Sequence, residues 1–347
     1  MHKPRALRPG DRVAAVSLSS GLAGEGAVIE RFSLAQRRLS EHFSLELCPM
    51  PNALRGIEYL DRHPQARAED WMAAVADPDI AGIFCTIGGE DSIRLLPHVD
   101  FGLLAANPKV FLGYSDTTVS HFMLYKAGVT SYYGPCLLME FAENVAMHAY
   151  TSEHVVRALM DPPATQTILP SPEWTSEFLD WGDPSNNARR RSMTPDPRGY
   201  VLLQGEGVAE GPLIGGCLDV LPMLIGTELW PSAGHFQSAL LFLETSEECP
   251  PPSLLRYLLR NLAAQGLLER IGGILFGKPY HGRYEAEYWA VLRRVVAEEA
   301  GRPTLPILCN LNFGHTSPIC TLPYGLRARI DCAARRLSLL EPPTGPA

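Results

Sequence analysis

A chain of 347 residues with 46% hydrophobic and 20% charged residues has the composition of a globular protein with room for one large or two medium domains. The formal net charge is −8, and apart from Arg189-Arg190-Arg191 there is no dense basic run, so we expect no nucleic-acid polymer as partner. No segment has signal-peptide character or approaches the ~20 apolar residues of a membrane span. The eight cysteines are scattered, which favours reduced thiols in a cytoplasmic protein without membrane association.

The first half of the chain alternates strand-like apolar runs with helical patterns. We expect strands at residues 13–17, 43–48, 80–87 and 110–112, and helices at 26–40, 64–75, 91–96 and 117–126. This alternation predicts an α/β fold with a parallel, Rossmann-like sheet that carries helices on both faces.

The second half predicts a smaller α/β domain. Helices are expected at 217–224, 252–265 and 285–300, and strands at 239–243, 272–276 and after Pro318. A polar stretch rich in proline and arginine separates the halves. We therefore expect an N-terminal domain at 1–165, an active-site loop and connector at 166–200, and a C-terminal domain at 201–347, with the active site in the cleft between the two domains.

Ser115 is the strongest candidate for a nucleophile. The apolar run 110–112 breaks at Gly113, and Ser115 follows just before a predicted helix. A strand-turn-helix elbow of this kind presents a serine hydroxyl above the sheet, beside free backbone N–H groups at the helix start. A serine that merely caps the helix would give the same local pattern.

A base and an acid follow downstream, each after an apolar run. Glu244 ends the run 239–243, and His315 follows the run 305–308 through Phe313 and Gly314. Catalytic groups cluster at the carboxyl ends of parallel strands, so Ser115, Glu244 and His315 are candidates for a nucleophile, acid and base triad. Glu247 and Glu248 are rival acids, and a strand-end carboxylate or a loop histidine can also be purely structural.

At these residues the chain resembles the LD-carboxypeptidase family of serine peptidases. The resemblance rests on Ile-Gly-Gly-Glu-Asp at 87–91, Gly-Tyr-Ser-Asp-Thr at 113–117, Gly-Gly at 215–216 with Gly-Thr at 226–227, Leu-Glu at 243–244 and Phe-Gly-His-Thr at 313–316. It implies that Ser115 is the nucleophile, Glu244 the acid and His315 the base. It also implies that the backbone N–H groups of Asp116 and of the Gly88-Gly89 turn form the oxyanion hole.

The loop at 166–200 resembles the microcin C immunity branch of this family more than the cell-wall branch. It carries Trp174 and Trp181 in polar surroundings, and the resemblance implies that such an aromatic residue stacks on the nucleobase of a substrate. The two tryptophans can equally pack an interface or a hydrophobic patch. Lys278, after the run 272–276, is a further candidate to pair with an anionic substrate group, although a lysine at a strand end is more often solvated.

These observations predict a serine hydrolase that cleaves an amide or peptide bond near a free carboxylate. The expected substrate is a small aminoacyl-nucleotide or peptide, with no cofactor, and the expected assembly is a homodimer. No metal is expected, because ligand-spaced cysteines and a His-Glu-x-x-His motif are both absent from the sequence. The alternatives are a murein tetrapeptide LD-carboxypeptidase and a non-catalytic protein that binds a nucleotide-like ligand. Cys217 and Thr245, where the family usually has asparagine and aspartate, leave the substrate open.

Overall fold

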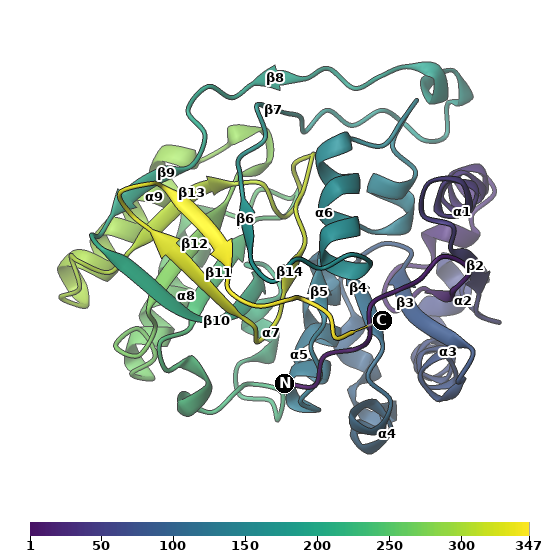
Figure 1. Cartoon of the computed structure of the whole chain (residues 1–347), viewed down its shortest axis with the longest axis horizontal. Helices are drawn as coiled ribbons and strands as arrows, with labels where there is room; N and C mark the ends of the chain where they lie inside the picture. The colour runs from purple at the N-terminus through teal and green to yellow at the C-terminus, as the bar shows by residue number, and fades with distance from the viewer. Residues whose placement is uncertain (347) are drawn as a thin grey trace.

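The computed structural model describes residues 1–346, which fold around two sheets lying side by side (Figure 1). The first sheet has the spatial order β14-β5-β4-β3-β1-β2. Its strands are β1 (Arg12–Val16), β2 (Glu46–Pro49), β3 (Ile80–Cys85), β4 (Val110–Gly113), β5 (Tyr132–Tyr133) and β14 (Leu322–Pro323). All neighbours are parallel except β14, which is antiparallel to β5. The predicted parallel, Rossmann-like sheet is therefore confirmed.

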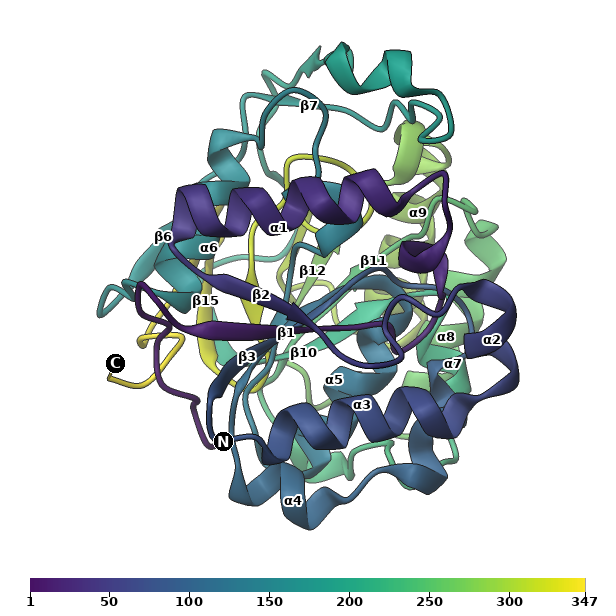
Figure 2. The ribbon, with the colours of Figure 1, turned by 90° about the vertical axis from the view of Figure 1, so that its right-hand side faces the viewer.

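Helices cover both faces of this sheet, as Figure 2 shows for α1 (Ile29–Phe43) on one face and α3 (Pro64–Ala76) on the other. The helix α1 buries Phe32, Ala35 and Leu39, whose spacing of three and four residues forms one apolar stripe. Further helices are α2 (Ile57–Arg62), α4 (Phe101–Ala106), α5 (Thr118–Lys126) and α6 (Ala149–Leu159). The helices α2, α4 and α6 were not expected from the sequence. The helix expected at 91–96 is instead a 3₁₀ segment, Ser92–His98, which contains Pro97.

The second sheet has eight strands in the order β6-β16-β15-β10-β11-β12-β13-β9. They are β6 (Gln166–Ile168), β9 (Val201–Gln204), β10 (Val208–Cys217), β11 (Leu240–Glu244), β12 (Gly273–Gly277), β13 (Ile307–Leu311), β15 (Arg327–Asp331) and β16 (Arg336–Leu339). The central strands β10 to β13 are parallel and the flanking pairs are antiparallel. The helices of this half are α7 (Leu221–Leu224), α8 (Pro252–Ala264) and α9 (Glu285–Leu292). The expected helix at 217–224 was too long, because Cys217 still belongs to β10.

The two halves touch closely at the end of β10. A Cβ at Gly216 would lie 2.5 Å from Cγ2 of Thr118, the first residue of α5. The Cys217 N–H donates to Oγ1 of the same threonine over 3.1 Å. Glycine at 216 therefore allows the backbone of the second sheet to approach the helix that follows Ser115.

Two segments cross between the halves. β14 comes late in the chain but joins the first sheet, whereas β6 comes early but pairs with β16 of the second sheet. Near the ends of the chain, Arg5 and Gly345 form a parallel bridge. The domain boundaries expected at residues 165 and 200 remain a prediction.

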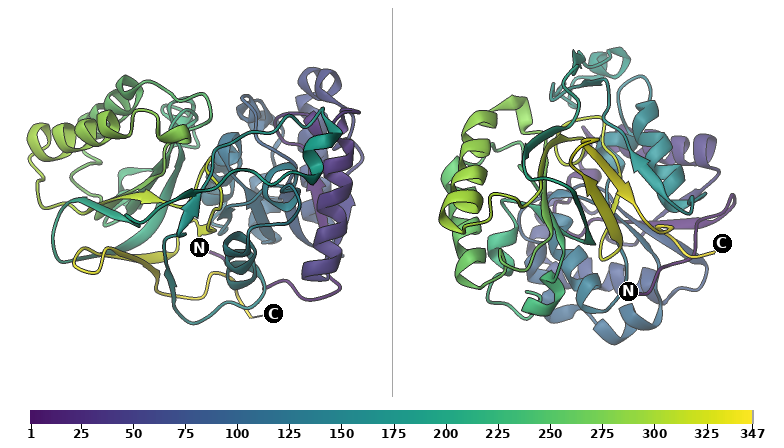
Figure 3. Two further views of the ribbon diagram at one scale, coloured as in Figure 1. Left: turned by 90° about the horizontal axis from the view of Figure 1, so that it is seen from above. Right: turned by 60° about the vertical axis from the view of Figure 1, so that its left-hand side comes forward.

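The segment between β6 and β9 passes over both halves. It contains the short hairpin of β7 (Glu173–Trp174) and β8 (Thr194–Pro195), and it extends toward α1 (Figure 3, left). We call residues 169–200 the lid. Thr175 in the lid exchanges two backbone hydrogen bonds with Ser317, of 2.7 and 2.9 Å. Among residues 1–346, none of the helices is both long enough and apolar enough to cross a membrane.

Candidate active site

Ser115 lies on a sharp turn directly after β4. Its φ of 65° is in the left-handed region, which few non-glycine residues occupy, and the helix α5 begins three residues later. The Ser115 N–H donates to the hydroxyl of Tyr133 over 3.2 Å. The expected strand-turn-helix arrangement is thus present, and it turns the serine toward the second sheet.

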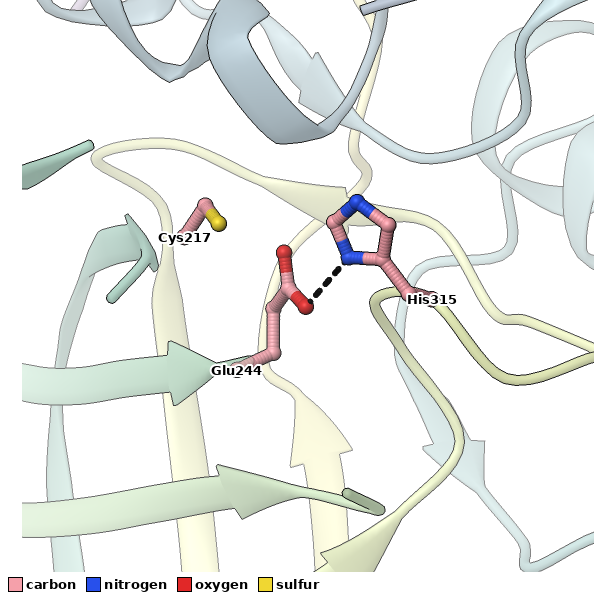
Figure 4. Close-up of side chains that lie close together, drawn as sticks. All are labelled: Cys217, Glu244 and His315. Atoms are coloured by element: carbon pink, nitrogen blue, oxygen red, sulfur yellow. Dashed lines mark hydrogen bonds and ion pairs between the residues drawn. The ribbon is translucent and has the colours of Figure 1, made fainter. Parts of the chain in front are cut away.

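His315 links Ser115 to Glu244. Its Nε2 lies 3.0 Å from Ser115 Oγ, and its Nδ1 lies 2.7 Å from Glu244 Oε2, the contact drawn in Figure 4. Glu244 is the last residue of β11, and His315 lies in the loop after β13. When the neutral imidazole carries its proton on Nδ1, Nδ1–H donates to Glu244, and Nε2 is left as an acceptor that faces the Ser115 hydroxyl. The structure thus brings together all three residues that the sequence analysis selected for a triad.

Two further residues hold Glu244 in place. The Tyr133 hydroxyl donates to Glu244 Oε1 over 2.5 Å, and burial raises the pKa of this tyrosine well above its usual value, so the proton stays available. Gly314 has a φ of 95°, and a Cβ there would lie 2.5 Å from Glu244 Oε2. Glycine before His315 therefore provides both the turn and the room for the carboxylate.

Carboxylates control the charge of His315. Burial lowers its pKa, but Glu244, through charge and hydrogen bond, and the carboxylates of Glu247 and Asp219 raise it, with a resulting pKa of about 9. Glu247 Oε2 lies 3.2 Å from His315 Nε2, on the same nitrogen that faces Ser115. The acidic surroundings therefore favour the protonated, imidazolium form of His315.

The candidate oxyanion donors lie beside Ser115. A Cβ at Gly88 would lie 2.9 Å from Ser115 Oγ and 3.5 Å from the backbone nitrogen of Asp116, so the turn and the start of the helix face each other across the serine. The Asp116 carboxylate is buried and accepts hydrogen bonds from Ser19 Oγ and from the Ser92 N–H. Asp116 therefore joins two neighbouring loops next to Ser115.

A pocket of about 540 Å³ opens onto the triad. Its lining comes from both halves and from the lid: Ser20, Leu22, Ile87, Gly88, Gly89, Tyr114, Ser115, Met139, Phe178, Trp181, Glu247, Tyr280 and His315. Mostly apolar walls with a few converging polar groups are typical of small-molecule sites. Phe178 and Tyr280 were not among the candidates expected from the sequence, and Glu247 was expected only as a rival acid.

Trp181 is the lid tryptophan that reaches this pocket. The guanidinium carbon of Arg31 lies 4.5 Å from the centre of its ring, and Phe178 packs beside it at a centroid distance of 5.4 Å. Arg31 in turn donates to Asn144 Oδ1 and to two backbone carbonyls, so it is a fixed support. The indole is therefore held in position by a cation–π contact before a ligand arrives.

Trp174 and Lys278 lie elsewhere. Neither belongs to the described lining of the pocket, and the Lys278 ammonium lies 5.2 Å from the Trp174 ring. Lys278 Nζ is buried and donates to Asp196 Oδ2 and Asn310 Oδ1, each over 2.5 Å. With these partners the lysine fixes the base of the lid, and the structure does not bring it to the triad.

Cys217, Glu244 and His315 are grouped so that one ligand atom from each lies within 4.8 Å of the others (Figure 4). These atom types are those that zinc binds. However, both oxygens of Glu244 already accept hydrogen bonds, and burial raises the pKa of the Cys217 thiol well above its usual value. Glu244 and His315 therefore fit the hydrogen-bonded chain with Ser115 better than they fit a metal centre with Cys217. The members of the group are distant in sequence, so residue spacing did not reveal it.

Comparison with known proteins identifies the family. Residues 13–134 match the LD-carboxypeptidase N-terminal domain, and residues 210–330 match the LD-carboxypeptidase C-terminal domain. The chain is 30% identical to the microcin C7 self-immunity protein MccF of Escherichia coli, over 79% of this chain and 78% of that protein. It is 27% identical to the murein tetrapeptide carboxypeptidase of Pseudomonas aeruginosa, over 80% of this chain and 85% of that protein.

Solved structures agree with these matches. An MccF-like protein from Streptococcus pneumoniae in complex with AMP superposes with a TM-score of 0.87 at 32% identity, covering 95% of this chain and 98% of that one. MccF in complex with glutamyl sulfamoyl guanosine superposes with a TM-score of 0.86 at 25% identity, covering 99% and 100%. Another MccF structure is an active-site mutant in which a serine, an asparagine and a lysine are replaced by alanine. Both halves and the whole fold match, so the chain belongs to the LD-carboxypeptidase family and is a peptidase.

Proposed function

We propose that this peptidase uses Ser115, His315 and Glu244 to hydrolyse an amide bond in aminoacyl-nucleotide compounds. The observation that carries the proposal is the hydrogen-bonded chain from Ser115 Oγ through His315 to Glu244, at the mouth of a pocket that also contains Trp181. A nucleophile beside an aromatic platform suits a substrate with a scissile acyl group at one end and a nucleobase at the other.

The reaction would take place in two steps. Ser115 Oγ attacks the acyl carbon while its proton passes to His315 Nε2, and the N–H groups of Asp116 and the Gly88-Gly89 turn receive the oxyanion. His315 then gives the proton to the leaving nitrogen, which leaves an ester on Ser115. Water, activated by His315, hydrolyses this ester and restores the serine.

Relatives support the substrate class. MccF has been crystallised with glutamyl sulfamoyl guanosine and with aspartyl sulfamoyl adenosine, and the pneumococcal protein with AMP. In this chain, Trp181 and Phe178 offer the aromatic surface on which a base would stack. Homodimer assembly and a cytoplasmic location stay predictions.

The test compares two substrates by mass spectrometry: an aminoacyl-sulfamoyl-adenosine and an L,D-linked muropeptide. We expect turnover of the first, and a loss of about 10⁴-fold or more in Ser115→Ala, with the thermal midpoint unchanged. Turnover of the muropeptide alone would favour the murein reaction. A Ser115→Ala protein within tenfold of wild type would exclude the triad, and labelling of Ser115 by a fluorophosphonate separates an enzyme from a binding protein.

A further inference from the structure

One charged side chain of the pocket stands apart from the triad. Glu247 follows β11 by three residues, its side chain is 58% exposed, and its Oε2 reaches to 3.2 Å from His315 Nε2. It is the one carboxylate in the described lining of the pocket. A substrate held for attack by Ser115 must therefore bring its acyl group close to this charge.

Among the residues described as lining the pocket, only His315 can carry a positive charge that balances Glu247. The described lining contains neither lysine nor arginine. The nearby guanidinium groups are occupied: Arg191 pairs with Glu143, and Arg31 lies against Trp181 and is hydrogen-bonded to Asn144. Asp219 adds a further negative charge on the His315 side. The end of the pocket where the bond is cleaved is thus acidic.

A free carboxylate on the substrate would require positive charge at this end of the pocket, whereas the charge there is negative. A substrate carboxylate within a few ångströms of Glu247 would be repelled, whereas an ammonium group would be attracted. The MccF active site has a lysine among its mutated residues, but the described pocket lining of this chain has none.

We propose that Glu247 is a specificity-determining residue. It selects substrates with an ammonium group on the acyl side of the scissile bond and rejects substrates with a carboxylate group there. The inference deepens the proposed function, since it names the acyl group of that same site. The ammonium belongs either to the α-amino group or to a basic side chain of the aminoacyl residue. Both offer the same chemistry to Glu247.

A first experiment does not depend on the natural substrate. Three fluorophosphonate probes that differ only in their tail, which ends in an ammonium, a methyl or a carboxylate group, are compared by their rate of labelling Ser115. We expect the ammonium probe to react about tenfold faster than the carboxylate probe. Glu247→Gln should remove this preference, and Glu247→Lys should reverse it. The ratio between tails is the readout, because any change in His315 reactivity affects all three probes equally.

Glu248→Gln is the matched control. It removes the same charge one residue away, from a side chain that is also exposed but outside the described lining of the pocket. We expect it to keep the wild-type ratio. Equal labelling rates for the three tails in the wild type, or the same loss of preference in Glu248→Gln as in Glu247→Gln, would overturn the inference.

A second experiment separates this inference from the proposed function. Lysyl-, norleucyl- and glutamyl-sulfamoyl-adenosine, each with a free and with an acetylated α-amine, are compared by kcat/KM. Loss of rate on acetylation assigns the ammonium to the α-amine, and a preference for lysyl over norleucyl assigns it to the side chain. If no compound is hydrolysed while the probes still differ, the substrate class is wrong and the role of Glu247 stands. If all are hydrolysed at equal rates, the role of Glu247 is wrong and the substrate class stands.

Discussion

Gly88 approaches Ser115 so closely that a methyl group at residue 88 would lie 2.8 Å from Ser115 Cβ and 2.9 Å from Oγ. Gly88→Ala must therefore displace the serine or the turn that faces it. We expect kcat to fall by about 10²–10³, the size of effect that follows loss of an oxyanion donor. Gly26→Ala is the control, because a Cβ at Gly26 meets no atom within 4 Å. Equal activity of the two variants would contradict the close approach.

The two lid tryptophans should differ in their effect on nucleotide binding. Trp181 lies in the pocket and Trp174 beside Lys278, so only Trp181→Ala should weaken binding of AMP. Loss of a base–aromatic stack is worth ~1–3 kcal/mol, or roughly ten- to a hundredfold in Kd by calorimetry. The loss should be absent for a muropeptide, which has no nucleobase. Equal losses from both tryptophan variants would indicate that they act by holding the lid together.

Activity should rise with pH as His315 loses its proton. The base must be neutral in the free enzyme, and its pKa of about 9 lies above the usual 6.5, so kcat/KM should increase up to about pH 9. Glu247→Gln removes one of the charges that raise this pKa, and the midpoint should move to lower pH. The raised pKa also stabilises the fold. This contribution is full below pH 6.5 and is lost as the pH rises through about 9. A midpoint that does not move in Glu247→Gln would contradict the contact with His315.

Lys278 should matter for stability. Lys278→Met leaves the Asp196 carboxylate buried without its ammonium partner, and we expect a loss of ~3–5 kcal/mol in the free energy of unfolding, measured in urea. Adding Asp196→Asn should recover part of the loss. The sequence-based role of Lys278 in substrate binding predicts instead a higher KM at unchanged stability, and that outcome would contradict the buried pairing.

The residues of the candidate triad could be predicted from the sequence because they follow a simple geometric rule. Ser115 and Glu244 come at the carboxyl ends of β4 and β11, where apolar runs stop at polar residues, and His315 follows β13 in the same way. Alternating patterns along the first half likewise predicted its parallel sheet. In these places local sequence and tertiary position agree.

Side-chain pairing between segments that are distant in the sequence could not be predicted. Lys278 donates to Asp196, which is 82 residues away in the sequence, and Arg31 donates to Asn144, which is 113 residues away. Nothing in the local pattern distinguishes these buried cations from solvated ones. Strands were expected after Pro318, and β14 is one of them, but its place in the first sheet could not be predicted, since two residues paired with a distant edge carry no periodicity.

Because β14 pairs with β5, the two halves of this protein should not be stable when they are produced separately. A fragment that ends in the lid would contain β1 to β5 but would leave the edge of β5 bare, and the remaining fragment would contain β14 with no sheet to join. Bare strand edges invite pairing with other chains, so each half produced alone should aggregate. Coexpression of the two halves should instead yield a complex, because each contributes a strand to the other's sheet.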